Sequence, residues 1–176
     1  MNRKQYAKII YLFPVLLLSS FMLAYFIAPF YSQHLALVHT GMELICVFIA
    51  LCSYFIIYHA YKQNSNANLL MGLGFLMVGI FDLFHTFYFQ AFSWYPQDLY
   101  DINTRFWILG RLTEALLFLC TTRILIGKSI NKYVGSAVAV SLAFGISLIM
   151  MYYPHAFPVL LIKSQGVTAT KIVFEY

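Results

Sequence analysis

Charged side chains are scarce in this chain, and their scarcity decides its class. Of 176 residues only 10% are charged, whereas 62% are apolar, and the mean hydropathy is +0.78. So little polar surface cannot wrap a soluble globule of this size, and intrinsic disorder requires the opposite composition. The net charge of +5 is dispersed along an apolar chain rather than gathered in a basic patch, so no nucleic-acid partner is expected. The composition predicts a protein whose partner is the lipid bilayer.

Cysteine is also scarce. Cys46, Cys52 and Cys120 each lie inside an apolar run, and no C-x-x-C pair occurs. This pattern excludes a disulfide framework and a zinc finger. No phosphate loop, nucleotide motif or nucleophile elbow occurs either. The sequence therefore predicts that this chain is not itself an enzyme.

What the chain has instead is long apolar runs. At 1.5 Å per residue, about 20 residues cross a bilayer core of about 30 Å. Five runs have this length, at residues 9–31, 35–58, 69–89, 106–126 and 134–153. After breaks at Pro154 and Pro158, the first turns of a sixth helix begin near Lys171. The predicted fold is an all-α, polytopic transmembrane helix bundle of five complete helices plus the start of a sixth, forming one domain that is incomplete at its C-terminus.

The basic residues predict how the bundle is oriented. Lys and Arg near the ends of the spans are more frequent on the side of the membrane where the N-terminus lies than on the opposite side. The first group is Arg3, Lys4, Lys8, Lys62, Arg123, Lys128 and Lys132, and the second is Arg105, Lys163 and Lys171. By the positive-inside rule, we expect the N-terminus in the cytoplasm and the connection 93–104 on the outer side.

Three predicted helices each carry a carboxylate and a basic side chain about one turn apart. Spacings of three or four residues place both members of a pair on one helix face. The pairs are His39 with Glu43, Asp82 with His85, and Arg111 with Glu114. Counted at 1.5 Å per residue from the outer helix ends, the carboxylates lie roughly 11 to 14 Å deep and the basic groups roughly 6 to 9 Å deep. Because an ionisable group at mid-bilayer costs about 2.5 to 3.5 kcal/mol, these residues need partners, and the common depth predicts one shared layer.

Two interpretations of this layer stay open. In the first, a buried network of ion pairs fixes the register of the helices. In the second, the layer is a pocket that binds a small ligand or ion. A divalent metal such as zinc or iron would then take its ligands from His39, Glu43, Asp82 and His85. Haem held by His39 and His85 is a weaker alternative.

Four stretches of the chain carry a resemblance to a known family. They are residues 39–43 (HTGME), 72–86 (ending GIFDLFHT), 104–114 (TRFWILGRLTE) and 166–176 (GVTATKIVFEY). In this order they resemble the third type of membrane-associated sensor domain (MASE type three), the N-terminal input module of bacterial sensor histidine kinases and diguanylate cyclases. Trp107 of the third stretch completes the candidate ligand-binding set, with His39, Glu43, Asp82, His85, Arg111 and Glu114.

The resemblance implies a multi-pass domain of the bacterial inner membrane. Its output domain, a kinase or a cyclase, would follow in the cytoplasm, and because the family pattern continues past Tyr176 the chain is expected to be truncated. The leading hypothesis is a sensory input domain that detects a small ligand or ion from the outer side. A fragment of a proton, ion or small-molecule transporter is the first alternative, and a structural membrane anchor is the second. The sequence leaves the oligomeric state undecided, and a homodimer is one alternative.

Overall fold

The structure is a computed structural model that describes residues 3–61, 66–89, 100–123, 130–162 and 166–175. Side chains are described from residue 14 onward, except those of residues 100, 122 and 123. Most of the connection expected at 93–104, together with Lys62, Lys128 and Lys163, lies outside the described residues. The chain divides into two compact units, Met1–His39 and Thr40–Tyr176.

The first unit consists of α1 (Arg3–Gln33) and the first residues of α2 (Leu35–Ala60), with His34 between the two helices. All described side chains from residue 14 to residue 37 are exposed, although most of them are apolar. An apolar surface of this length fits a helix whose surroundings are lipid.

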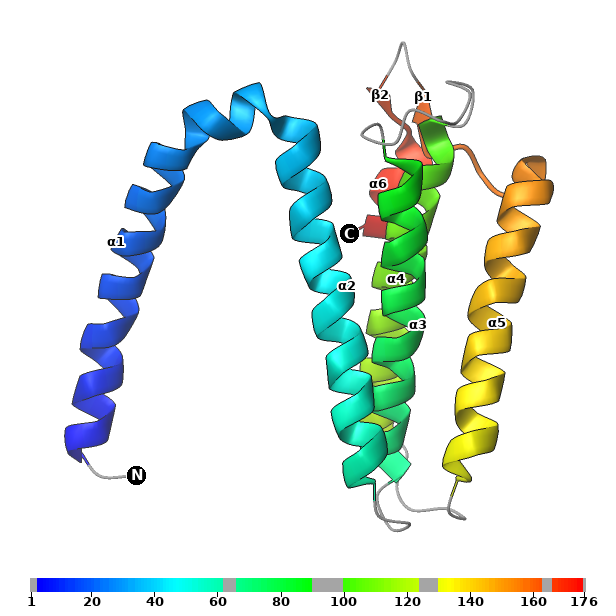
Figure 1. Cartoon of the computed structure of the whole chain (residues 1–176), viewed down its shortest axis with the longest axis horizontal. Coiled ribbons are helices and arrows are strands. Elements are labelled where there is room, and N and C mark those ends of the chain that lie inside the picture. Colours follow the sequence, from blue (N-terminus) through cyan, green and yellow to red (C-terminus); the bar gives the residue numbers. More distant parts are fainter. Residues whose placement is uncertain (1–2, 62–65, 90–99, 124–129, 163–165, 176) are drawn as a thin grey trace. The chain divides into compact units, whose positions relative to one another are not determined.

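The second unit is a bundle centred on α3 (Asn66–Tyr88). The remainder of α2 precedes it, and the elements that follow are α4 (Tyr100–Arg123), α5 (Lys132–Tyr152), η2 (Pro154–Ala156), β1 (Leu161–Ile162), β2 (Gly166–Val167) and α6 (Ala169–Glu175). Helix α3 packs along α4 and against α5 (Figure 1). Glycines of α3 approach α2 closely, since a Cβ on Gly79 would lie 3.4 Å from the Cβ of Ala50. Helix α3 is therefore in contact with three other helices.

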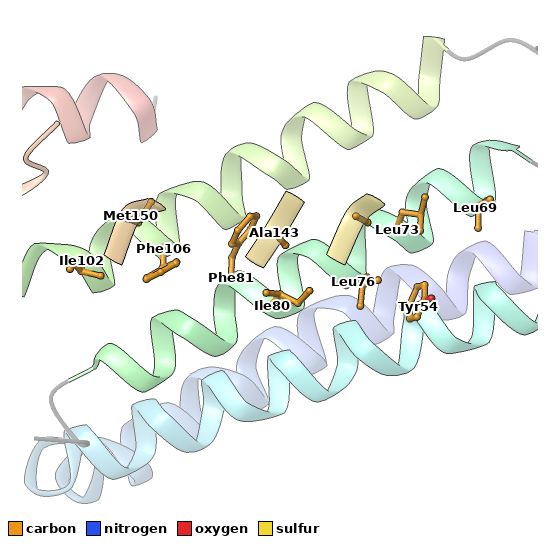
Figure 2. Close-up of a cluster of buried hydrophobic side chains, with 11 residues drawn as sticks. Tyr54, Leu69, Leu73, Leu76, Ile80, Phe81, Ile102, Phe106, Ala143 and Met150 are labelled. Atoms are coloured by element: carbon orange, nitrogen blue, oxygen red, sulfur yellow. The ribbon is translucent and has the colours of Figure 1, made fainter. Parts of the chain in front are cut away.

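The core follows α3 along its length. Figure 2 shows a file of buried side chains from α2, α3, α4 and α5: Tyr54, Leu69, Leu73, Leu76, Ile80, Phe81, Ile102, Phe106, Ala143 and Met150. Phe84 of α3 stacks on Phe106 of α4, with ring centroids 5.2 Å apart. On α5, Ala143 and Ser147 are fully buried, and small side chains of this kind let transmembrane helices approach closely.

Within the described part of the chain, four helical segments are long and apolar enough to cross a membrane. They cover Pro14–Gln33, Leu35–Ala60, Asn66–Tyr88 and Lys132–Tyr152. Helix α4 is not one of these segments, because it carries too many charged residues for a membrane span by composition. It nevertheless packs along α3. The prediction of an all-α bundle of membrane-crossing helices is confirmed, and the inclusion of α4 as a fifth span stays a prediction.

Helices α1 and α3 begin six and three residues before the predicted spans, and two further differences bear on the site. Helix α4 begins at Tyr100 rather than near Phe106, because Asp101 and Arg105 form a pair four residues apart on its first turns. The short hairpin of β1 and β2 was not predicted; it pairs Leu161 with Val167. Gly166 in this hairpin has a φ of 82°, a backbone conformation that glycine adopts without steric cost.

Candidate functional site

One guanidinium joins two carboxylates on neighbouring helices. Nη2 of Arg111 on α4 donates to both oxygens of Asp82 on α3, at 3.1 and 3.3 Å, and its Nη1 donates to Oε2 of Glu114 at 2.9 Å. The side chain of Asp82 is 4% exposed, whereas those of Arg111 and Glu114 are 43% and 38% exposed. The cluster of Asp82, Arg111 and Glu114, called the cavity cluster below, holds two carboxylates for one guanidinium.

The close approach of α3 and α4 brings this cluster together. Gly110 lies beside Asp82, and a Cβ on Gly110 would be 3.1 Å from Oδ1 of Asp82. Further along the two helices, a Cβ on Gly74 would meet the side chain of Leu117. Glycine at both positions lets the backbones lie close enough for Arg111 to reach across to α3.

The cavity cluster lines a cavity of about 210 Å³ bounded by α2, α3 and α4. The lining residues are Cys46, Ile49, Ala50, Met71, Gly74, Phe75, Val78, Asp82, Arg111, Glu114, Leu117, Phe118 and Thr121. Asp82 is the last of these on α3, and Arg111 and Glu114 are the first on α4. Since α3 and α4 run in opposite directions, the three ionisable groups occupy one end of the cavity. Apolar side chains line most of the rest.

A second polar contact joins α2 and α3. Nε2 of His85 lies 3.8 Å from Oε1 of Glu43, and Nδ1 of His85 lies 2.8 Å from the backbone carbonyl of Asn103. A carbonyl oxygen only accepts hydrogen bonds, so Nδ1 carries the hydrogen. In the neutral ring, Nε2 then presents its lone pair on the side of Glu43. A histidine fixed in this way through its other nitrogen is the usual arrangement of a metal ligand, and the same ring would form an ion pair with Glu43 if it were protonated.

Several of the predicted site residues of the second unit are in direct contact. Asp82 of the proposed metal set is bound by Arg111, whereas Glu43 and His85 face each other. His39 is the last residue of the first unit and lies one helical turn before Glu43 on α2. The ring of Trp107 lies 5.3 Å from Nζ of Lys171 and does not line the cavity. The assignment of these residues as ligands stays a prediction.

The sequence analysis missed a second Asp–Arg cluster at the start of α4. Oδ1 of Asp101 accepts the backbone N–H groups of Leu160 and Leu161 at 2.8 and 2.6 Å, and its Oδ2 accepts Nε of Arg105 at 2.7 Å. Nη1 of Arg105 donates to the carbonyl of Pro154. This hairpin cluster, Asp101 and Arg105, joins α4 to the segment that follows α5. The i,i+4 spacing was the available signal, but Asp101 falls in the connection predicted at 93–104 and Arg105 falls just before the predicted span 106–126.

The second unit is thus a bundle of apolar helices with ionisable side chains on its interior faces. The model of the membrane-associated sensor domain family MASE3 matches residues 30–176, and the chain belongs to this family. No curated protein and no solved structure matches the chain. The resemblance found in the sequence is confirmed, and the chain is a membrane-associated sensor domain.

Proposed function

We propose that this chain is the sensory input domain of a bacterial signalling protein, and that a small ligand or ion bound at the cavity cluster changes how α3 and α4 pack. The observation that carries the proposal is the ion pair of Arg111 with Asp82 across the two helices, at one end of a cavity. A ligand that competes for these groups would favour a different arrangement of the helices. Small shifts of packed helices are a common way to pass such a change onward.

The proposed receiver is a histidine kinase or diguanylate cyclase domain on the cytoplasmic side. The coding sequence downstream of Tyr176 tests this part directly, since it should encode such a domain in the same frame. A frame that instead continues into a transporter or a purely structural protein would contradict the proposal.

We propose that the domain lies in the bacterial inner membrane with its N-terminus in the cytoplasm. Single cysteines at Asn2 and Asp98, in a background without native cysteines, test it through labelling with an impermeant maleimide. We expect position 98 to react in intact spheroplasts and position 2 to react only after permeabilisation. The reverse pattern would overturn the orientation.

A divalent metal is the second candidate ligand, and the contact of His85 with Glu43 is the observation that favours it. Nitrogen and carboxylate ligands of this type suit zinc, iron or another divalent ion, and His39 is the further ligand that the sequence predicts. Elemental analysis of gently purified protein should find close to one metal per chain, lost in His85→Ala and retained in His155→Ala, a control in η2. Folded protein without metal or haem absorbance would contradict it.

Transport is the alternative that the intramembrane carboxylates favour, because such groups also form proton relays. Purified protein in liposomes with an imposed proton or cation gradient tests it. The sensor proposal expects no flux above that of empty liposomes. Flux that is lost in Glu114→Gln would favour a transporter. If variants of the cavity cluster change neither flux nor signalling, the domain is a structural anchor.

A further inference from the structure

We infer that the cavity bounded by α2, α3 and α4 accepts an amphiphilic molecule that has an apolar body and a cationic, hydrogen-bond-donating head group such as a primary ammonium. The inference rests on the proposed function, because it names the ligand class of the same site. It follows from the lining of the cavity, from the charge balance at its polar end, and from the surface onto which it opens.

The lining fits an apolar body of moderate size. Between the polar end and Thr121, the cavity is bounded by side chains such as Phe75, Val78 and Leu117. Its volume of about 210 Å³ exceeds that of a cavity of about 150 Å³ that binds benzene. An aromatic ring with a short alkyl chain therefore fits. A compact polar solute would leave most of this apolar surface without contacts.

The charge balance favours a cationic head group. Among the side chains that line the cavity, two carboxylates, Asp82 and Glu114, stand against the single guanidinium of Arg111, so with all three ionised the polar end has a surplus of one negative charge. Both terminal nitrogens of Arg111 already donate to these carboxylates. An anion would be limited to the remaining N–H groups of Arg111 and would raise the negative surplus. An ammonium group would neutralise the surplus and donate to Glu114, whose side chain is 38% exposed.

The position of the opening favours a ligand that arrives through the bilayer. Two of the lining side chains, Ile49 on α2 and Phe118 on α4, are among the exposed large hydrophobic residues of the chain. Both helices present further exposed apolar side chains nearby, such as Phe48 and Leu119. In a membrane this surface meets lipid. An amphiphile that partitions into the bilayer can reach such an opening, whereas a solute confined to water cannot.

A series of probes that share one apolar body tests the inference. The probes are 4-phenylbutylamine, 4-phenylbutan-1-ol and 4-phenylbutyrate, applied to the full chain in phosphatidylcholine nanodiscs. The readout is the rate at which a lipid-soluble maleimide labels Cys46, which lines the cavity, relative to Cys120, which is exposed on α4 and does not line it. We expect the amine to protect Cys46 at about tenfold lower concentration than the alcohol, a preference of about 1.4 kcal/mol. The acid should protect least, and the labelling of Cys120 should not change.

Charge-neutral variants identify the group that recognises the head. Glu114→Gln should raise the amine concentration needed for protection to that of the alcohol. Glu175→Gln removes the same charge from an ion pair with Lys171 on α6, outside the cavity, and should change nothing. Protection by the acid as strong as by the amine would overturn the inference, and so would equal protection by all three probes or protection by none.

The outcome separates this inference from the proposed function. If Glu114→Gln changes the activity of the output domain while no probe protects Cys46, the sensor proposal stands and the ligand class is wrong. If the amine protects Cys46 but leaves the activity of the output domain unchanged, the ligand class stands and the sensor proposal is wrong.

Discussion

Two Asp–Arg clusters involve α4, one within its first turns and one that joins it to α3, and they differ in how completely their polar atoms are bonded within the chain. In the hairpin cluster, Asp101 accepts two backbone N–H groups and the side chain of Arg105, which is 7% exposed. In the cavity cluster, Arg111 is 43% exposed and Glu114 lines an open cavity. The first cluster is closed by the chain itself, whereas the second presents charge to whatever occupies the cavity.

This difference separates charge that holds the fold from charge that can respond to a ligand. A buried ion pair that also satisfies backbone groups becomes costly when it is broken, because each remaining partner loses its compensation. The pair of Arg111 with Glu114 is partly exposed on both sides and costs less to rearrange, so a ligand of modest affinity can compete for it. The predictions below test this contrast in order of decreasing effect.

The largest loss of stability should follow Arg105→Leu in the hairpin cluster. The change leaves Asp101 and the carbonyl of Pro154 without the guanidinium that both contact. We expect a loss of about 3 to 5 kcal/mol in the free energy of unfolding, measured by denaturation in detergent micelles. Leu116→Ala, at an exposed position on the same helix, is the control. An equal loss in both variants would show that the hairpin cluster does not hold the fold.

A smaller loss should follow Arg111→Leu in the cavity cluster. The change leaves the buried Asp82 without its partner, at a cost of about 3 kcal/mol for a broken buried ion pair. Glu114 is 38% exposed and loses little. Adding Glu114→Gln should recover part of the loss, because one uncompensated charge is removed. A double-mutant cycle in the same micelles measures the coupling. Strictly additive losses would contradict a shared cluster.

The close approach beside Asp82 should make Gly110→Ala unfavourable. A Cβ at Gly110 would lie 3.1 Å from Oδ1 of Asp82, whereas a Cβ at Gly145 of α5 would meet nothing within 4 Å. We expect a loss of about 1 kcal/mol for Gly110→Ala and a neutral or stabilising effect for Gly145→Ala, because alanine favours the helix. Equal effects would mean that the spacing of α3 and α4 does not depend on Gly110.

The smallest effect should come from Lys171→Met on α6. Nζ of Lys171 lies 5.3 Å from the ring of Trp107 and 3.1 Å from Oε2 of Glu175. Such contacts contribute about 0.5 to 1 kcal/mol. With Trp94→Phe as background, the emission of Trp107 reports the change directly. An unchanged emission spectrum would place Lys171 away from the ring.

The sequence predicted the all-α fold and the residue types of the cavity cluster for a physical reason. Helix rise converts sequence position into depth, so Asp82, Arg111 and Glu114 could be assigned to one layer without any structure. Depth says nothing about how each helix is rotated about its axis. That rotation depends on packing, for instance at Gly74 and Gly110. The pairing of Asp82 with Arg111, and of His85 with Glu43, could not be derived from spacing.

The hairpin cluster was missed because hydropathy treats charge as a sign of a connection. Asp101 and Arg105 lower the local hydropathy, so the predicted helix began after them, although their i,i+4 spacing suits a helix. Their partners, the backbone groups of Leu160 and Leu161, carry no signal in the sequence. Long-range contacts of side chains with backbone become visible only when the fold brings the segments together.

The central claim is that the cavity cluster carries the signal while the hairpin cluster holds the fold. The most direct test compares Glu114→Gln with Asp101→Asn in the full-length protein in native membranes. It measures the activity of the proposed output domain per folded molecule, together with the melting temperature. We expect Glu114→Gln to change the activity per folded molecule with little change in melting temperature. Asp101→Asn should lower the melting temperature and leave that activity unchanged. Activity per folded molecule that is unchanged in Glu114→Gln, or that follows the melting temperature in both variants, would contradict the claim.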